Sequence, residues 1–260
     1  MSPTLPQETL EEIIDHLYDD WNTLLICSLA SHAFIPSTRR LLFSRISLFP
    51  REIEAAVQMF GDTHGTIARA IRHLEITDRT PPDNRHCWPD TKNVEKTPIN
   101  VPLLRTRLQS LQVMRLEYIC DVHIPSLFWK VTRSLAGVRE IQIDQMFCDN
   151  SHQFLGFLSS FLSLKSIAVT KCHWSGQPSA LIPSCAPELS HVSVLEIGSS
   201  AQQYILQWLL SQKVSLSLHT LRLNLGIDVD TAFLVNSLLE IVSPTLKELY
   251  ISLENGIRGW

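Results

Sequence analysis

The residue types that carry out chemistry are present in this chain, but their spacing does not assemble a catalytic site. Asp228 and Asp230 could pair on a cation, although Asp230 better fits the N-cap of a helix that follows it. Residues 61–66 lack the lysine of a phosphate-binding loop, and residues 156–160 lack the glycine spacing of a nucleophilic serine turn. Because no nucleophile, base and orienting group can be assigned together, the sequence predicts a protein that is not an enzyme.

The cysteines and histidines are also dispersed along the chain. No Cys-x-x-Cys pair occurs, whereas zinc sites need ligands that converge from paired spacings. Cys148 and His152 are four residues apart, which would place them on one face if a single helix held both. We therefore predict structural thiols, no metal site and no cofactor. The cysteines are Cys27, Cys87, Cys120, Cys148, Cys172 and Cys185.

The composition narrows the class of partner. The 260 residues are 45% hydrophobic and carry a net charge of −4, enough apolar surface for a core but no basic excess for phosphate backbones. No stretch of about 18 apolar residues is present, and the acidic N-terminus lacks the basic region of a signal peptide. We expect a cytoplasmic or nuclear protein with no nucleic-acid partner and no membrane partner.

The first fifty residues predict three short helices. The first has apolar residues at the spacing of one helix face, with Thr4 as its N-cap and Pro6 in its first turn. A second apolar segment follows Asp19 and Asp20, and a third begins at Pro36. Three helices this short bury little by themselves, so the module needs a surface to pack against. The apolar positions are Leu10, Ile13, Ile14 and Leu17 in the first helix and Leu24, Leu25 and Leu29 in the second.

The order of residues over positions 3–48 resembles the F-box, and especially the F-box-like proteins of mushroom-forming fungi. That family opens with Leu-Pro-x-Glu, continues with paired apolar residues and a helix with paired leucines, and ends at a Phe or Trp. The matching residues here are Leu5-Pro6-Gln7-Glu8, Leu10, Ile13-Ile14, Leu17, Leu24-Leu25, Cys27-Ser28-Leu29 and Leu42-Phe43.

The resemblance implies a docking module at residues 1–48 that binds the small adaptor subunit of SCF-type cullin–RING ubiquitin ligases. Its matched positions would divide between the interior of the module and the partner's groove, and the sequence does not sort them. The alternative is that the helices only cap the domain that follows. The predicted adaptor-binding residues are Leu5, Pro6, Ile13, Ile14, Leu17, Leu24, Leu25 and Leu29.

An apolar-x-x-apolar-x-apolar pattern then recurs seven times. Its middle residues are separated by 40, 27, 26, 28, 26 and 28 positions, and each triplet ends in the alternation of a short strand. Strands separated by helical segments at this period resemble leucine-rich repeats, although the family's Asn or Cys appears only as Cys172. We expect an α/β fold, with residues 49–260 forming an irregular parallel β/α solenoid. The middle residues are Leu74, Met114, Ile141, Ile167, Leu195, Leu221 and Leu249.

Two segments interrupt or end this pattern. The Pro-rich residues 79–107 form an insertion in which Trp88 is either a target-binding anchor or a satellite core residue. The last strand should end near Leu253. The seven residues beyond it then cover the exposed edge, or the chain is a shortened version of a longer protein.

These features predict a substrate receptor of an SCF-type ubiquitin ligase. The helical module would bind the adaptor and cullin complex, and the repeat surface or the insertion would bind an unknown protein substrate. Such a receptor contributes proximity, because other subunits transfer the ubiquitin. The alternative is a repeat protein that serves as an interaction scaffold and has no role in a ligase.

Overall fold

The structure is a computed structural model that describes residues 5–61, 66–78, 106–120, 129, 132, 135, 137–148, 151–174, 189–211, 216–226 and 229–253. Trp88, with most of the predicted insertion at residues 79–107, lies outside the described residues, as do residues 254–260.

Three α-helices begin the chain, as their apolar spacing predicts. They are α1 (Gln7–Asp15), α2 (Trp21–Ala30) and α3 (Ile35–Leu42), with a 3₁₀ turn η1 (His32–Phe34) before α3. The prediction that Pro6 lies in the first turn of α1 was wrong. Pro6 has an extended backbone and is the N-cap residue, and its carbonyl accepts the bond from the Leu10 N–H at 3.2 Å.

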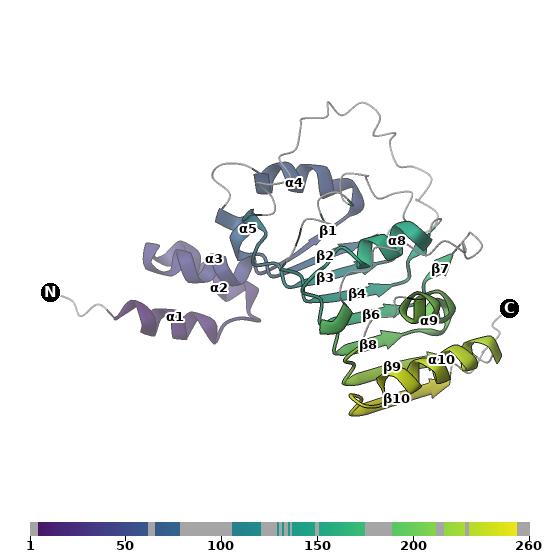
Figure 1. Cartoon of the computed structure of the whole chain (residues 1–260). Helices are drawn as coiled ribbons and strands as arrows, with labels where there is room; N and C mark the ends of the chain where they lie inside the picture. Colours follow the sequence, from purple (N-terminus) through teal and green to yellow (C-terminus); the bar gives the residue numbers. More distant parts are fainter. Residues whose placement is uncertain are drawn as a thin grey trace.

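The rest of the chain is built on one eight-stranded parallel sheet whose strands follow one another in chain order (Figure 1). The strands are β1 (Arg45–Leu48), β2 (His73–Thr77), β3 (Val113–Glu117), β4 (Glu140–Asp144), β6 (Ser166–Thr170), β8 (Val194–Ile197), β9 (Thr220–Leu225) and β10 (Glu248–Leu253). A second, two-stranded parallel sheet joins β5 (Phe147–Cys148) to β7 (His173–Trp174). The protein therefore belongs to the α/β class.

The seven strands predicted from the recurring triplets are all present and in register. Leu74 pairs with Met114, which pairs with Ile141, and the same row continues through Ile167 to the later strands. From β2 to β9 these side chains are buried, because alternate residues of each strand point to one face of the sheet, whereas Leu249 in β10 is exposed.

The sheet has an additional first strand. Arg45–Leu48 forms β1 and pairs with β2, although these residues fall inside the range 1–48 assigned to the helical module. Phe43, Ile46 and Leu48 also fit the spacing of the triplets, and Ile46 and Leu48 pack against the core of the sheet.

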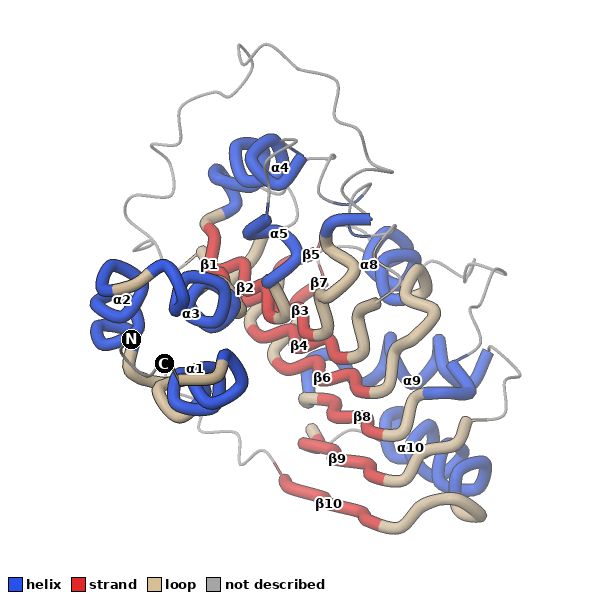
Figure 2. The backbone as a smooth tube through the Cα atoms, turned by 90° about the vertical axis from the view of Figure 1, so that its left-hand side faces the viewer, coloured by secondary structure: helices blue, strands red, loops and turns tan. Residues whose placement is uncertain are grey.

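Helices α8 (Ser151–Leu158), α9 (Gln202–Ser211) and α10 (Val229–Val242) lie on one side of the sheet (Figures 1 and 2). The 3₁₀ turn η2 (Pro50–Glu52) and the helices α4 (Ile53–Gly61) and α5 (Thr66–Ala70) connect β1 to β2. Two more 3₁₀ turns, η6 (Leu189–His191) and η7 (Ser199–Ala201), lie in later connections. Large aromatic side chains of α8, of the residues that follow it and of α9 are buried, among them Phe154, Phe157, Phe161 and Trp208.

Each of β3, β4 and β6 is followed by a left-handed residue and then by a buried one. Tyr118, Gln145 and Lys171 have φ of 56°, 54° and 50°, and the next residues are Ile119, Met146 and Cys172, which are fully buried. The N–H groups of Tyr118 and Gln145 donate to the carbonyls of Asp144 at 3.0 Å and Thr170 at 3.2 Å, the last residues of the neighbouring strands. Because main-chain bonds satisfy polar groups at these turns, the interior position next to each of them can be apolar.

The prediction that Asp230 is the N-cap of a helix was wrong, and the possible shared helix of Cys148 and His152 is not formed. Asp230 is not the N-cap of α10, because the helix already begins at Val229 and places Asp230 in its first turn. Cys148 ends β5 while His152 is in α8, so no single helix holds both. Within the described residues, no group of three or more His, Cys, Asp or Glu side chains could hold a metal ion. None of the described helices is long and apolar enough to cross a membrane.

Candidate functional site

Helix α2 has apolar residues on every side, but this chain buries only one of them. Its sequence is WNTLLICSLA, and of its apolar side chains only Leu24 is buried, with 1% of its surface exposed. A helix that is apolar all round is normally buried on all sides. The remaining apolar surface of α2 is therefore the strongest candidate for a binding site in the helical module.

The structure sorts the eight predicted adaptor-binding residues into interior and surface groups. Ile14 and Leu24 form the module's own core with Leu42, and Leu17 packs half-buried against it. These residues hold the three helices together, and Ile14 and Leu24, each 1% exposed, cannot contact a partner. The exposed group consists of Leu5, Pro6, Ile13, Leu25 and Leu29.

The exposed side chains of α2 form a stripe. Trp21, Leu25 and Leu29 are spaced four residues apart, which aligns them along one face of the helix. Leu29 is the most exposed of them, with 88% of its surface accessible, and Ile26 lies one position from Leu25 on the adjoining face. Trp21 and Ile26 were not predicted from the sequence as adaptor-binding residues, because the resemblance assigns that role only to positions that match the family pattern. Tyr18, exposed just after α1, was missed for the same reason.

A hollow of about 480 Å³ opens beside this stripe, between α2, η1 and α3. Leu25 and Leu29 line one side of it, and Ile35, Leu42 and Phe43 line the other. Six of the ten lining residues are aliphatic or aromatic, and Ser28, Ser31, His32 and Arg39 make up the rest. The hollow therefore suits an apolar side chain from a partner that also offers polar groups at the rim.

Local polar contacts fix the ends of these helices. Asp20 caps α2 by accepting bonds from the Thr23 N–H at 3.0 Å and the Thr23 hydroxyl at 2.7 Å. The hydroxyl bond, followed by the main-chain bond, lowers the pKa of Asp20 below its ordinary value. The Arg40 guanidinium donates to the Asp15 carboxylate and ties α3 to the end of α1. The apolar stripe is therefore held on a defined scaffold.

The module continues directly into the sheet. Ser44 follows α3, and its carbonyl accepts bonds from the N–H groups of Arg72 at 2.8 Å and His73 at 2.9 Å. Helix α3 also contacts α5. These contacts anchor α3 at the β1 edge of the sheet, whereas the stripe on α2 remains exposed.

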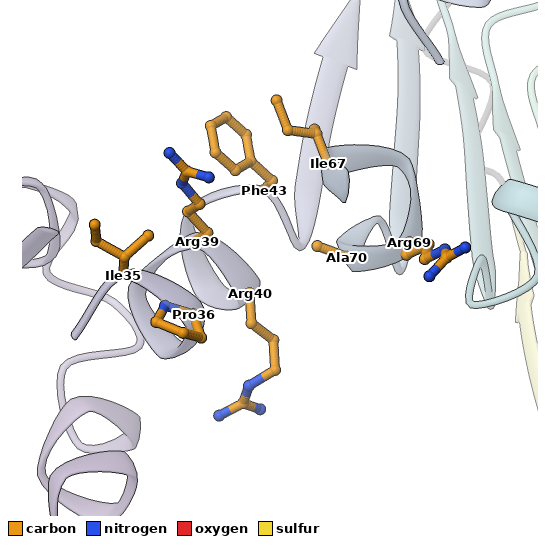
Figure 3. Close-up of a pocket in the computed structure, with 8 residues that line it drawn as sticks. All are labelled: Ile35, Pro36, Arg39, Arg40, Phe43, Ile67, Arg69 and Ala70. Carbon is orange, nitrogen blue, oxygen red and sulfur yellow. The ribbon is translucent and has the colours of Figure 1, made fainter. Parts of the chain in front are cut away.

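A second hollow, of about 410 Å³, lies between α3 and α5 and has three arginines on its rim. The side chains of Arg39, Arg40 and Arg69 point in different directions (Figure 3), and Arg40 is paired with Asp15. Three guanidinium groups that do not converge cannot hold an anion together. This hollow is therefore a junction between the module and the sheet and no candidate for a ligand site.

The residues that alternate with the buried row lie on the opposite face of the sheet. This face carries both signs of charge. One register row runs from Glu75 through Arg115, Gln142, Ala168, Glu196 and Arg222 to Tyr250. Arg222 pairs with Glu196 at 3.5 Å and lies over the Tyr250 ring at 5.3 Å. Such a mixed row suits a protein surface and does not offer the continuous positive charge that a nucleic acid requires.

No protein-family model matches this sequence, and a search of curated proteins found no significant similarity.

Proposed function

We propose that this protein is a substrate receptor of an SCF-type cullin–RING ubiquitin ligase, which docks the ligase adaptor through α1 and α2 and recruits a target protein through the sheet. In this proposal the helices are an F-box-like module, and the sheet with its crossovers is a leucine-rich-repeat-like solenoid. The protein has no catalytic role; it brings the target close to the ubiquitin-carrying subunits.

The observation that carries the proposal is the surface of α2. Four large apolar side chains, Trp21, Leu25, Ile26 and Leu29, stand in solvent on one ten-residue helix. Contiguous exposed apolar surface marks a protein interaction site in a soluble protein. The Leu5-Pro6-Gln7-Glu8 opening and the paired leucines make the ligase adaptor the partner to test first.

The face of the sheet opposite the buried row is the proposed target site. Its side chains come from seven successive strands in register, so they form one continuous surface. Charges of both signs and an aromatic ring at Tyr250 favour a folded protein or an extended peptide as the target.

The test is co-purification of the full chain with the recombinant adaptor, beside the double variant Leu25→Asp, Leu29→Asp. Both leucines are exposed, so the variant should keep the helical circular dichroism of the parent. Loss of two apolar anchors at about 1–2 kcal/mol each should weaken adaptor binding at least about 30-fold.

The matched control is Leu162→Asp, which changes an equally apolar, exposed residue (64%) near the end of α8. The control should bind the adaptor like the parent. If the parent does not bind at tens of micromolar, or if the double variant binds as well as the parent, the ligase proposal is wrong. The scaffold alternative would then describe the protein better.

A further inference from the structure

The last described strand, β10, leaves its outer edge open. Among the described strands it pairs only with β9, and all six of its residues are exposed. Figures 1 and 2 both place it at the far edge of the sheet from β1, with α10 beside it. The edge presents unpaired N–H and C=O groups, which favour the addition of another strand.

The exposed residues of β10 include the row that is buried in the inner strands β2 to β9. Leu249 and Ile251 are in register with Leu221 and Leu223, which are buried, yet they are 43% and 50% exposed. Leu253 continues the row at 65% exposed. None of these three positions is charged, so this edge lacks the charged residues on its core face that commonly block pairing between sheets.

The strand is complementary to a second copy of itself. In an antiparallel pair related by a two-fold axis perpendicular to the sheet, opposed residues point to the same face. With the axis at Tyr250, Leu249 falls opposite Ile251 of the copy, and Glu248 falls opposite Ser252 of the copy. Leu249 and Ile251 therefore meet on the core face, Leu253 falls opposite Lys247 of the copy, and no like charges are opposed.

This symmetry also keeps the helices on one side. A two-fold axis perpendicular to the sheet brings α10 of each copy to the same face, next to the joined strands. Helix α10 is long enough at Val229–Val242 to extend the contact, and its Phe233 and Ile241 are exposed apolar residues. A copy thus supplies what β10 lacks, a partner strand and a helix layer beyond it.

We propose that two copies of this chain associate through β10, joining their sheets into one continuous sheet with antiparallel pairing centred on Tyr250. This inference is independent of adaptor docking, because the helical module precedes β1 at the opposite edge of the sheet.

The first test is the oligomeric state of the full chain by sedimentation velocity over a range of concentrations. We expect a concentration-dependent dimer that Ile251→Lys converts to a monomer, because the charge would fall in the apolar centre of the joined sheet. Leu162→Lys, at a similarly exposed leucine away from β10, should leave the dimer unchanged. Both variants should still bind the adaptor if the proposed function is correct.

The second test reports the register and does not depend on a destabilising change. Tyr250→Cys places two thiols opposite each other, at the Cα separation of about 4.5–5.5 Å that a disulfide accepts. Ser252→Cys, on the same face, places them about four residues apart along the strands, or about 13 Å, too far to join. The parent chain, with its six cysteines, measures the background of cross-linking.

Oxidation should yield a covalent dimer of Tyr250→Cys several-fold above the background, and none above it for Ser252→Cys. Equal cross-linking at both positions, or a dimer that persists in Ile251→Lys, would overturn the proposal. So would a monomer at 100 μM or above. In that case, slow hydrogen exchange in β10 would mean that the chain covers its own edge, and fast exchange would point to another kind of partner.

Discussion

Replacement of Leu24 by alanine tests the separation of core from docking surface in the helical module. Leu24 is 1% exposed and packs with Ile14 and Leu42 in a small cluster that is distinct from the core of the sheet. We expect Leu24→Ala to loosen α1, α2 and α3 without unfolding the sheet, because the two cores do not share their buried residues.

The magnitude follows from the burial of the side chain. Leu24→Ala removes three carbon atoms from the interior at about 0.8 kcal/mol each, and the cavity left behind adds to this loss. The neighbouring Leu17 and Phe34 are only half-buried, so the site can partly collapse. We therefore expect a cost of about 2–3 kcal/mol, in the lower half of the usual range for such substitutions.

Hydrogen exchange measured by mass spectrometry resolves this cost by region. Peptides from residues 7–42 should exchange roughly 30- to 150-fold faster, since about 1.4 kcal/mol corresponds to a factor of ten. Peptides from β3 to β8 should be unchanged. The control Leu29→Ala alters a residue that is 88% exposed, so its effect on exchange should be below about 0.5 kcal/mol. Equal exchange in the two variants would refute the assignment of Leu24 to the core and Leu29 to the surface.

Two further predictions concern the sheet. In Gly137→Ala the new Cβ would lie 2.8 Å from the Gln109 carbonyl oxygen and 3.0 Å from that of Leu111, so the main chain must shift. We expect about 1–3 kcal/mol of destabilisation in urea titrations, and an unchanged midpoint would contradict this close packing. Burial raises the pKa of the Cys172 thiol to about 12, which keeps it protonated and unreactive toward iodoacetamide at pH 8 until the chain unfolds. Because the unfolded thiol loses its proton first, Cys172 should also lower stability as pH rises above about 9. Labelling of native Cys172 as fast as the partly exposed Cys27 would refute its burial.

The strand positions were predictable because each depends on a local pattern. Spacings such as Leu74 and Ile76, or Ile141 and Ile143, alternate with polar residues, and alternation alone tells which side of a strand is buried. The three N-terminal helices followed from the same kind of periodicity. Strand β1 was missed although Ile46 and Leu48 carry the pattern, because the resemblance had already assigned them to the helical module.

The sequence by itself determined seven strands of the main sheet, the three N-terminal helices and the apolar residues from which a docking site must be drawn. Only the tertiary structure decided which of these residues are buried. In a helix such as α2, helical spacing does not distinguish Leu24 from Leu25 because apolar residues lie on all sides, and the distinction comes from the contacts with Ile14 and Leu42. The same holds at β10, where Leu249 and Ile251 have the pattern of core residues but stand exposed. Burial there depends on what packs against the outer edge of β10, which the pattern within the strand does not specify.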